Sequence, residues 1–306
     1  MSEACPDLSV RIGSLVLPNP VMTASGTFGY GLEYADICDL SRLGAVVIKA
    51  ATVAPRVGNR PPRIVETAAG MLNAIGLQNP GADAIIAEKL PELAGFGVPI
   101  IANLAGECVD DYVLLADKFA ACGHVAALEL NISCPNVEGG MAFGVCPEMT
   151  AELVGSVRAI TDLPLITKLS PNVTDITEIA VAAVTAGSDA LSMINTLLGM
   201  SIDVRRRRPL LGNATGGLSG PAIRPVAVRC VWQVYDVVDV PIIGSGGIMC
   251  VEDALEFIMA GASAVAIGTA NFVNPLAGTE ILDGLVDYCQ SNGIKDISEI
   301  VGVAHG

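Results

Sequence analysis

The segment Pro241-Ile-Ile-Gly-Ser-Gly-Gly-Ile248, taken together with Ala264-Val-Ala-Ile-Gly-Thr-Ala270, decides the fold class. Each segment begins with a short apolar run, which is typical of a strand buried on both faces of a parallel sheet. Residues 251–259 between them have helical character. Two strands joined through a helix predict a βαβ unit with a right-handed crossover.

The same alternation of apolar runs and helix-like stretches extends outward over most of the chain. The apolar runs are residues 21–24, 45–48, 99–102, 126–130, 165–167, 190–193, 241–243 and 264–267. The helix-like stretches are residues 82–93, 110–121, 148–160, 176–186, 222–235, 251–259 and 279–289. Eight such units predict an α/β fold, a single (β/α)8 TIM barrel, with residues 1–306 as one domain. A doubly wound open sheet is the alternative, but no G-x-G-x-x-G fingerprint follows the first strand.

Further segments interrupt this alternation. Residues 8–17 alternate around Gly13-Ser14 and predict an N-terminal β-hairpin that closes the bottom of the barrel. Long insertions are expected after strands 2, 4 and 6, and those after strands 2 and 6 span residues 51–79 and 195–220. Because they follow strands, they belong on the face where barrels carry their active sites.

Composition excludes several classes of protein. The chain is 52% hydrophobic and 16% charged, which allows a large core, and its net charge of −15 disfavours nucleic acid and anionic membranes as partners. The one basic run, residues 205–208, is a solvated loop or a local contact with an anion or partner. Nine cysteines without a C-x-x-C pair predict free thiols, a cytoplasmic protein and no zinc or iron–sulfur site in this chain.

The residues that follow the apolar runs are polar or glycine at all eight ends. They are Ser25, Lys49, Asn103, Asn131, Lys168, Asn195, the run Gly244–Gly247, and Gly268 with Thr269. Either lysine alone can reach water along its stem, but two lysines at one barrel mouth indicate an anionic ligand. Glycines after strands 7 and 8 are typical of a phosphate cradle, although tight turns also explain them.

The segment Asn131-Ile-Ser-Cys-Pro-Asn136 places a cysteine on the loop after strand 4. On such a loop Cys134 is a candidate nucleophile or base, whereas a buried structural thiol is the commoner fate of cysteine. Asn73, Asn131, Asn136 and Asn195 are expected at the same mouth. Amides both donate and accept hydrogen bonds, so they suit a planar ligand with N–H and C=O groups, but each alone is also a common turn former.

These motifs resemble those of the class 1 dihydroorotate dehydrogenases, over about residues 8–288. The motifs are Thr23-Ala-Ser-Gly26, Asn73-Ala-Ile-Gly-Leu77, the Asn131–Asn136 segment, Gly244-Ser-Gly-Gly247 and Ile267-Gly-Thr269. Two further segments, Asn195-Thr-Leu-Leu-Gly-Met200 and Thr215-Gly-Gly-Leu-Ser-Gly-Pro221, resemble the 1B catalytic subunit. The family is FMN-dependent and belongs to pyrimidine biosynthesis. The resemblance of this sequence to the family implies oxidation of dihydroorotate to orotate.

The resemblance also implies a role for each matching residue. Cys134 removes the C5 proton of dihydroorotate, and Lys168 lies near the N1/O2 edge of the flavin. The implied substrate site comprises Lys49, Asn73, Ala74, Ile75, Gly76, Leu77, Asn131, Asn136, Asn195 and Thr196. The implied site for one FMN per chain comprises Ser25, Lys49, Ala50, Asn103, Asn131, Lys168, Ile194, Gly220, Gly246, Gly247, Gly268 and Thr269.

The 1B subclass implies a partner subunit that carries FAD and a 2Fe–2S cluster and passes electrons to NAD⁺. It also implies a homodimer at the core of a heterotetramer. The alternatives are a fumarate-linked 1A enzyme, a dihydropyrimidine dehydrogenase-like flavoenzyme, a flavin-free phosphate-binding barrel or a non-catalytic binding subunit. One departure from the family pattern is Cys146, which precedes Pro147 where the family usually has an acidic residue.

Overall fold

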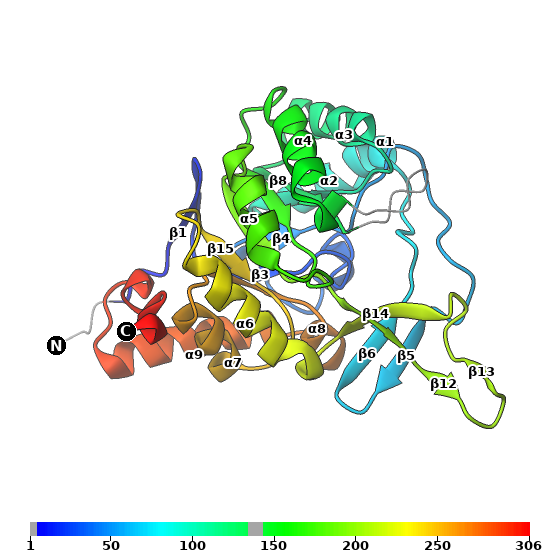
Figure 1. Cartoon of the computed structure of the whole chain (residues 1–306). Coiled ribbons are helices and arrows are strands. Elements are labelled where there is room, and N and C mark those ends of the chain that lie inside the picture. Colours follow the sequence, from blue (N-terminus) through cyan, green and yellow to red (C-terminus); the bar gives the residue numbers. More distant parts are fainter. Residues whose placement is uncertain (1–4, 134–142) are drawn as a thin grey trace.

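A computed structural model gives the architecture, and it describes residues 5–133 and 143–306. Eight parallel strands form one sheet in the order β3-β16-β15-β10-β9-β8-β7-β4 (Figure 1). The strands are β3 (Val21–Thr23), β4 (Val46–Val47), β7 (Ile100–Leu104), β8 (Ala127–Asn131), β9 (Leu165–Lys168), β10 (Ala190–Met193), β15 (Ile242–Gly244) and β16 (Ala264–Ile267). All eight overlap the predicted apolar runs, with ends that differ by at most two residues.

The sheet closes into a barrel between β3 and β4, the two strands at the ends of this order. Met22 pairs with Ala45 in a parallel bridge, and the Thr23 N–H donates to the Ala45 carbonyl at 3.2 Å. On the other side of this bridge, the Gly44 N–H donates to the Val21 carbonyl at 2.7 Å. Closure confirms the predicted TIM barrel and rules out the open doubly wound sheet.

Helices cover the outside of the barrel. They are α1 (Ala82–Ala84), α2 (Leu90–Ala94), α3 (Val109–Ala121), α4 (Pro147–Arg158), α5 (Ile176–Thr185), α6 (Arg224–Tyr235), α7 (Val251–Met259), α8 (Ala270–Val273) and α9 (Ala277–Asn292). A π-helical turn, Ile85–Lys89, joins α1 to α2. Short 3-10 turns lie at Leu32–Tyr34, Leu40–Arg42, Phe143–Val145, Pro221–Ile223, Ile297–Ile300 and Val303–His305.

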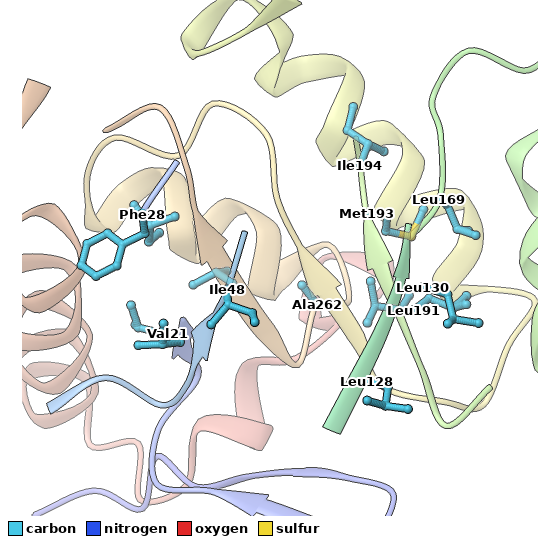
Figure 2. Packing of buried hydrophobic residues seen from close by; sticks show 14 of the residues in the cluster. Val21, Phe28, Ile48, Leu128, Leu130, Leu169, Leu191, Met193, Ile194 and Ala262 are labelled. Carbon is cyan, nitrogen blue, oxygen red and sulfur yellow. The ribbon is translucent and has the colours of Figure 1, made fainter. Parts of the chain in front are cut away.

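Side chains alternate between two cores because successive residues of a strand point to opposite faces. Leu128, Leu130 and Leu191 belong to the larger core, which the helices cover (Figure 2). Ala127 and Ile166 belong to the smaller core inside the barrel. This division gives the strands their nearly continuous apolar sequence, since both faces are buried.

The predicted N-terminal hairpin is present as β1 (Val10–Ile12) and β2 (Leu15–Leu17). Its residues Val10, Ile12 and Leu17 pack in the barrel's interior core. At the turn, Gly13 lies beside Asp189, which immediately precedes β10. The hairpin therefore closes the end of the barrel at which the strands begin, opposite the predicted mouth.

The insertions after strands 2 and 6 pair with each other. Strands β5 (Ile64–Thr67), β6 (Gly70–Asn73), β14 (Thr215–Ser219) and β11 (Leu197–Met200) form one antiparallel sheet. A second pair, β12 (Ile202–Asp203) and β13 (Arg208–Pro209), carries the basic run at its tip. These strands stand together on one side of the barrel (Figure 1). Most of the insertion predicted after strand 4 lies outside the described residues.

Candidate active site

Two adjoining hollows open where the barrel strands end. They adjoin each other, since both are lined by Ser25, Thr27, Asn195, Thr196 and Ser219. The predicted residues around the first are Ser25, Lys168, Ile194, Asn195, Thr196, Gly220, Gly246, Gly247, Gly268 and Thr269. Those around the second are Ser25, Lys49, Ala50, Asn73, Ala74, Ile75, Gly76, Leu77, Asn131, Asn195 and Thr196. The fold thus gathers residues from across the sequence into one space.

Three glycines of the first hollow have backbone conformations that side chains rarely adopt. Gly246 and Gly247 follow β15 with φ of 134° and 82°, and Gly220 has φ of 95°. A Cβ on Gly247 would lie 2.7 Å from the Gly220 carbonyl oxygen and 3.1 Å from the Arg224 backbone nitrogen. Only glycine lets these backbone segments approach so closely. Such bare backbone offers N–H groups to an anion.

A polar layer forms the floor beneath this hollow. Asn103, Glu129 and Lys168 lie on the neighbouring strands β7, β8 and β9, and all three are buried. Asn103 Nδ2 donates to Glu129 Oε1, and Lys168 Nζ lies 3.8 Å from the same oxygen. These residues stand two positions along their strands from Ile101, Ala127 and Ile166 of the interior core. The period of two therefore points them into the barrel as well.

A row of amides borders the second hollow. Asn195 Nδ2 donates to Asn131 Oδ1 at 3.1 Å, and Asn195 Oδ1 accepts from the Thr196 N–H at 2.8 Å. Asn73 ends β6 and donates through Nδ2 to the Gly217 carbonyl of β14 at 3.3 Å. The insertion sheet thus holds Asn73 close to residues from the barrel strands, and these side chains offer hydrogen bonds to a planar polar ligand.

Lys49 is half-buried on the wall of the second hollow. Burial is the largest influence and lowers the pKa of Lys49, because a charged ammonium loses hydration there. The nearby Glu33 carboxylate raises the pKa of Lys49 in part, and the Arg63 guanidinium lowers it. An anionic ligand beside Lys49 is favoured for the same reason, since it adds a negative charge that offsets the cost of burying the ammonium.

The loop after β8 is anchored at both of its described ends. The Tyr112 hydroxyl donates to the Asn131 carbonyl at 2.7 Å, and the Gly144 N–H donates to the Ile132 carbonyl at 2.9 Å. Phe143 packs edge-on against Tyr112, with ring centroids 5.8 Å apart. The loop therefore leaves and returns beside the amide row. Cys134 and Asn136 lie outside the described residues.

Comparison with known proteins identifies the family. The sequence model of the dihydroorotate dehydrogenase family matches residues 7–288. The chain belongs to the dihydroorotate dehydrogenase family. This confirms the resemblance drawn from the motifs.

Individual dihydroorotate dehydrogenases match nearly the whole chain. A protein of Desulforudis audaxviator is 61% identical over 298 residues, which is 97% of each chain. A protein of Geotalea daltonii is 58% identical over 300 residues, or 98% of each chain, and one of Parabacteroides distasonis is 54% identical over 297 residues, or 97% of each. All three are named dihydroorotate dehydrogenase B (NAD(+)), catalytic subunit.

A solved dihydroorotate dehydrogenase shares the fold. It is the Eimeria tenella protein in complex with ferulenol, with a TM-score of 0.82 and 24% sequence identity. The superposition covers 98% of this chain and 89% of that chain. This likeness confirms the TIM barrel independently of the strand pattern.

Several residues of this dihydroorotate dehydrogenase site were absent from the sequence prediction, and Thr27, Ser219 and Glu129 are examples. Ser219 lines both hollows and accepts a hydrogen bond from Thr269 Oγ1 at 2.8 Å. Glu129 lies in the floor, and a signal for it exists: it is the one acid inside an apolar run, two residues before Asn131. Four residues expected just after their strands lie within them instead, because these strands extend further than the apolar runs: Asn103 in β7, Asn131 in β8, Lys168 in β9 and Gly244 in β15.

The described residues also give information on metal sites, disulfides and membrane-spanning helices. Among residues 5–133 and 143–306, no cluster of three His, Cys, Asp or Glu side chains is arranged to hold a metal ion. The eight cysteines within the same ranges are free thiols. None of the helices formed by the described residues is long and apolar enough to span a membrane.

Proposed function

We propose that this chain oxidises (S)-dihydroorotate to orotate in de novo pyrimidine (UMP) biosynthesis, as an NAD⁺-linked dihydroorotate dehydrogenase. The observation that carries the proposal is the pair of adjoining hollows, one lined by the glycine cradle and Lys168 and the other by Lys49 and the amide row. The names of the relatives favour this activity over the fumarate-linked and dihydropyrimidine dehydrogenase-like alternatives. Family membership also disfavours a flavin-free barrel or a non-catalytic subunit.

The described residues fit FMN as the cofactor, one per chain. Gly246, Gly247 and Gly268 offer the close backbone approach that a phosphate needs. Asn103 Oδ1 is buried and has no hydrogen-bond partner among the described residues, as expected of an acceptor reserved for a ligand. The first hollow would therefore hold FMN through the predicted residues that line it, and the bound flavin would supply the hydride acceptor for dihydroorotate C6.

The chain's own side chains would divide the remaining tasks. Cys134, which follows β8 in the sequence, would take the proton from C5 of dihydroorotate as general base. Lys49 would pair with the substrate carboxylate, while Asn73, Asn131, Asn136, Asn195 and Thr196 would orient the ring through hydrogen bonds, beside the backbone of residues 74–77. Lys168 would place a positive charge beside the cofactor ring, which favours negative charge there.

The proposal includes a second subunit that works with this chain. The relatives' names call each of them a catalytic subunit, which supports a second subunit here as well. We infer that this subunit carries FAD and a 2Fe–2S cluster, that a homodimer of the present chain forms the core of a heterotetramer, and that the complex is cytoplasmic.

The isolated chain is expected to oxidise dihydroorotate rapidly with an artificial acceptor and slowly with NAD⁺. The physical reason is that NAD⁺ would receive electrons through the missing subunit. The measurement is steady-state orotate formation with each acceptor, with and without added partner. Rapid NAD⁺ reduction by the isolated chain would contradict the proposed division between subunits, whereas it would leave the activity itself standing.

Orotate binding is expected to weaken as the pH rises through the alkaline range. A lowered pKa means that Lys49 loses its proton at a lower pH than an ordinary lysine does. The affinity for orotate is therefore highest below the pKa of Lys49 and falls as the pH rises through that pKa. Lys49→Arg stays charged and should abolish this decline. Calorimetric titration with orotate over a pH series tests this, and identical profiles for the two proteins would contradict it.

A further inference from the structure

A buried ion pair lies under the cavity, and only one of its members faces the ligand space. The carboxylate of Glu129 and the ammonium of Lys168 are 3.8 Å apart, with side-chain exposures of 3% and 8%. Lys168 lines the first hollow, whereas Glu129 does not. Burying either charge alone is strongly unfavourable, so each requires the other. The buried Glu129 carboxylate therefore offsets part of the positive charge that Lys168 presents to the cavity.

Glu129 also determines the orientation of the Asn103 amide. An ionised carboxylate only accepts hydrogen bonds, so Asn103 must present its amide nitrogen to Glu129 Oε1. The Asn103 oxygen is then left without a partner among the described residues. The strand register fixes this arrangement, because Asn103 and Glu129 are direct partners in the β7–β8 ladder. One carboxylate thus determines which amide atom remains available to a ligand.

We propose that Glu129 is a positioning residue that holds the Lys168 ammonium at the cavity floor, orients the Asn103 amide and limits how strongly the lysine favours electrons on the bound flavin. This inference rests on the proposed function. A positive charge beside the flavin stabilises its reduced form, and a carboxylate close behind that charge offsets part of the effect. Glu129 therefore keeps the reduction potential low, so that the reduced flavin readily gives its electrons to a partner.

Glu129→Gln removes the charge but keeps the side-chain length and an oxygen that accepts from Asn103. The potential of bound FMN is expected to rise by at least the equivalent of a tenfold change in the reduction equilibrium, about 30 mV for a two-electron couple. It is measured by titration with dithionite against a reference dye, without dihydroorotate. The matched control is Glu152→Gln on the exposed surface of α4, which should leave the potential unchanged. An unchanged or lower potential in Glu129→Gln overturns the proposal.

A second variant keeps the test sharp if Glu129→Gln is poorly folded. The double variant Glu129→Gln/Lys168→Gln removes both charges, so no unpaired ammonium stays buried. In flavin-free protein, Glu129→Gln should lower the thermal unfolding midpoint, and adding Lys168→Gln should restore part of the loss. If adding Lys168→Gln lowers the unfolding midpoint further instead of restoring it, the two residues do not act as a pair. In the flavin-bound forms, the double variant should have a lower potential than Glu129→Gln alone.

The two proposals fail in different ways. If bound FMN is reduced by dithionite but not by dihydroorotate, the proposed activity is wrong and the role of Glu129 is still decided by the potentials. If dihydroorotate reduces the flavin but Glu129→Gln has the wild-type potential, the activity stands and the role of Glu129 is wrong. If the chain binds no flavin, the unfolding midpoints still decide whether Glu129 and Lys168 act as a pair.

Discussion

Replacing Cys134 with alanine is expected to leave FMN bound but to slow flavin reduction by dihydroorotate about 100- to 10,000-fold, the usual contribution of a general base. The C5 proton of dihydroorotate then has no positioned acceptor. Anaerobic stopped-flow absorbance of the flavin measures the rate directly. In the unmodified protein the rate should also rise toward alkaline pH, because an ordinary thiol loses its proton near about pH 8.5.

The chain offers a matched control for this substitution. Cys146 lies beyond the same loop, where its thiol donates to Glu148 Oε2 at 3.0 Å. We expect Cys146→Ala to reduce its flavin at about the wild-type rate, because the proposed mechanism gives that thiol no task. A wild-type rate in Cys134→Ala would show that another group takes the proton.

The second large effect is expected for Gly247→Ala, which should weaken FMN binding about ten- to a hundredfold. The new methyl group would lie 2.7 Å from the Gly220 carbonyl oxygen, at a φ of 82° that alanine rarely adopts. The cradle backbone must then shift, and a hydrogen bond to a charged phosphate is worth roughly 1.5–3 kcal/mol. Fluorescence titration of the flavin-free protein with FMN gives the dissociation constant.

Gly155→Ala is the matched control for the cradle. Gly155 lies in α4, has no positive φ and has open space where its Cβ would be. This alanine should leave FMN affinity unchanged and favour the helix by about 0.5–1 kcal/mol. If Gly247→Ala bound FMN as tightly as Gly155→Ala, the phosphate would have to bind elsewhere.

The barrel was predictable from sequence because its strands are buried on both faces. Runs such as 126–130 and 190–193 are nearly continuous in apolar residues, and long helix-like stretches separate most of the runs. The hairpin was predictable for the complementary reason, since one of its faces packs into the barrel and its residues alternate. Local patterns therefore determined both kinds of element.

The insertion sheet was not predictable in the same way. Its central pairing joins Gly217 to Asn73, two residues far apart in the chain, and neither segment has a strong strand pattern. The Glu129–Lys168 pair escaped prediction for a similar reason, because Glu129 alone looks like an isolated charge in an apolar run and the sequence does not show which side chain Lys168 meets. Contacts between neighbouring strands depend on pairing and register, which the sequence pattern does not specify.

The measurement that tests the central claim most directly is the visible spectrum of the purified chain before and after anaerobic addition of dihydroorotate. The account predicts a flavin absorption band that bleaches as orotate forms, which would establish the cofactor, the substrate and the reaction direction together. A colourless protein that cannot be reconstituted with FMN, or a flavin band that dihydroorotate leaves unchanged, would contradict it.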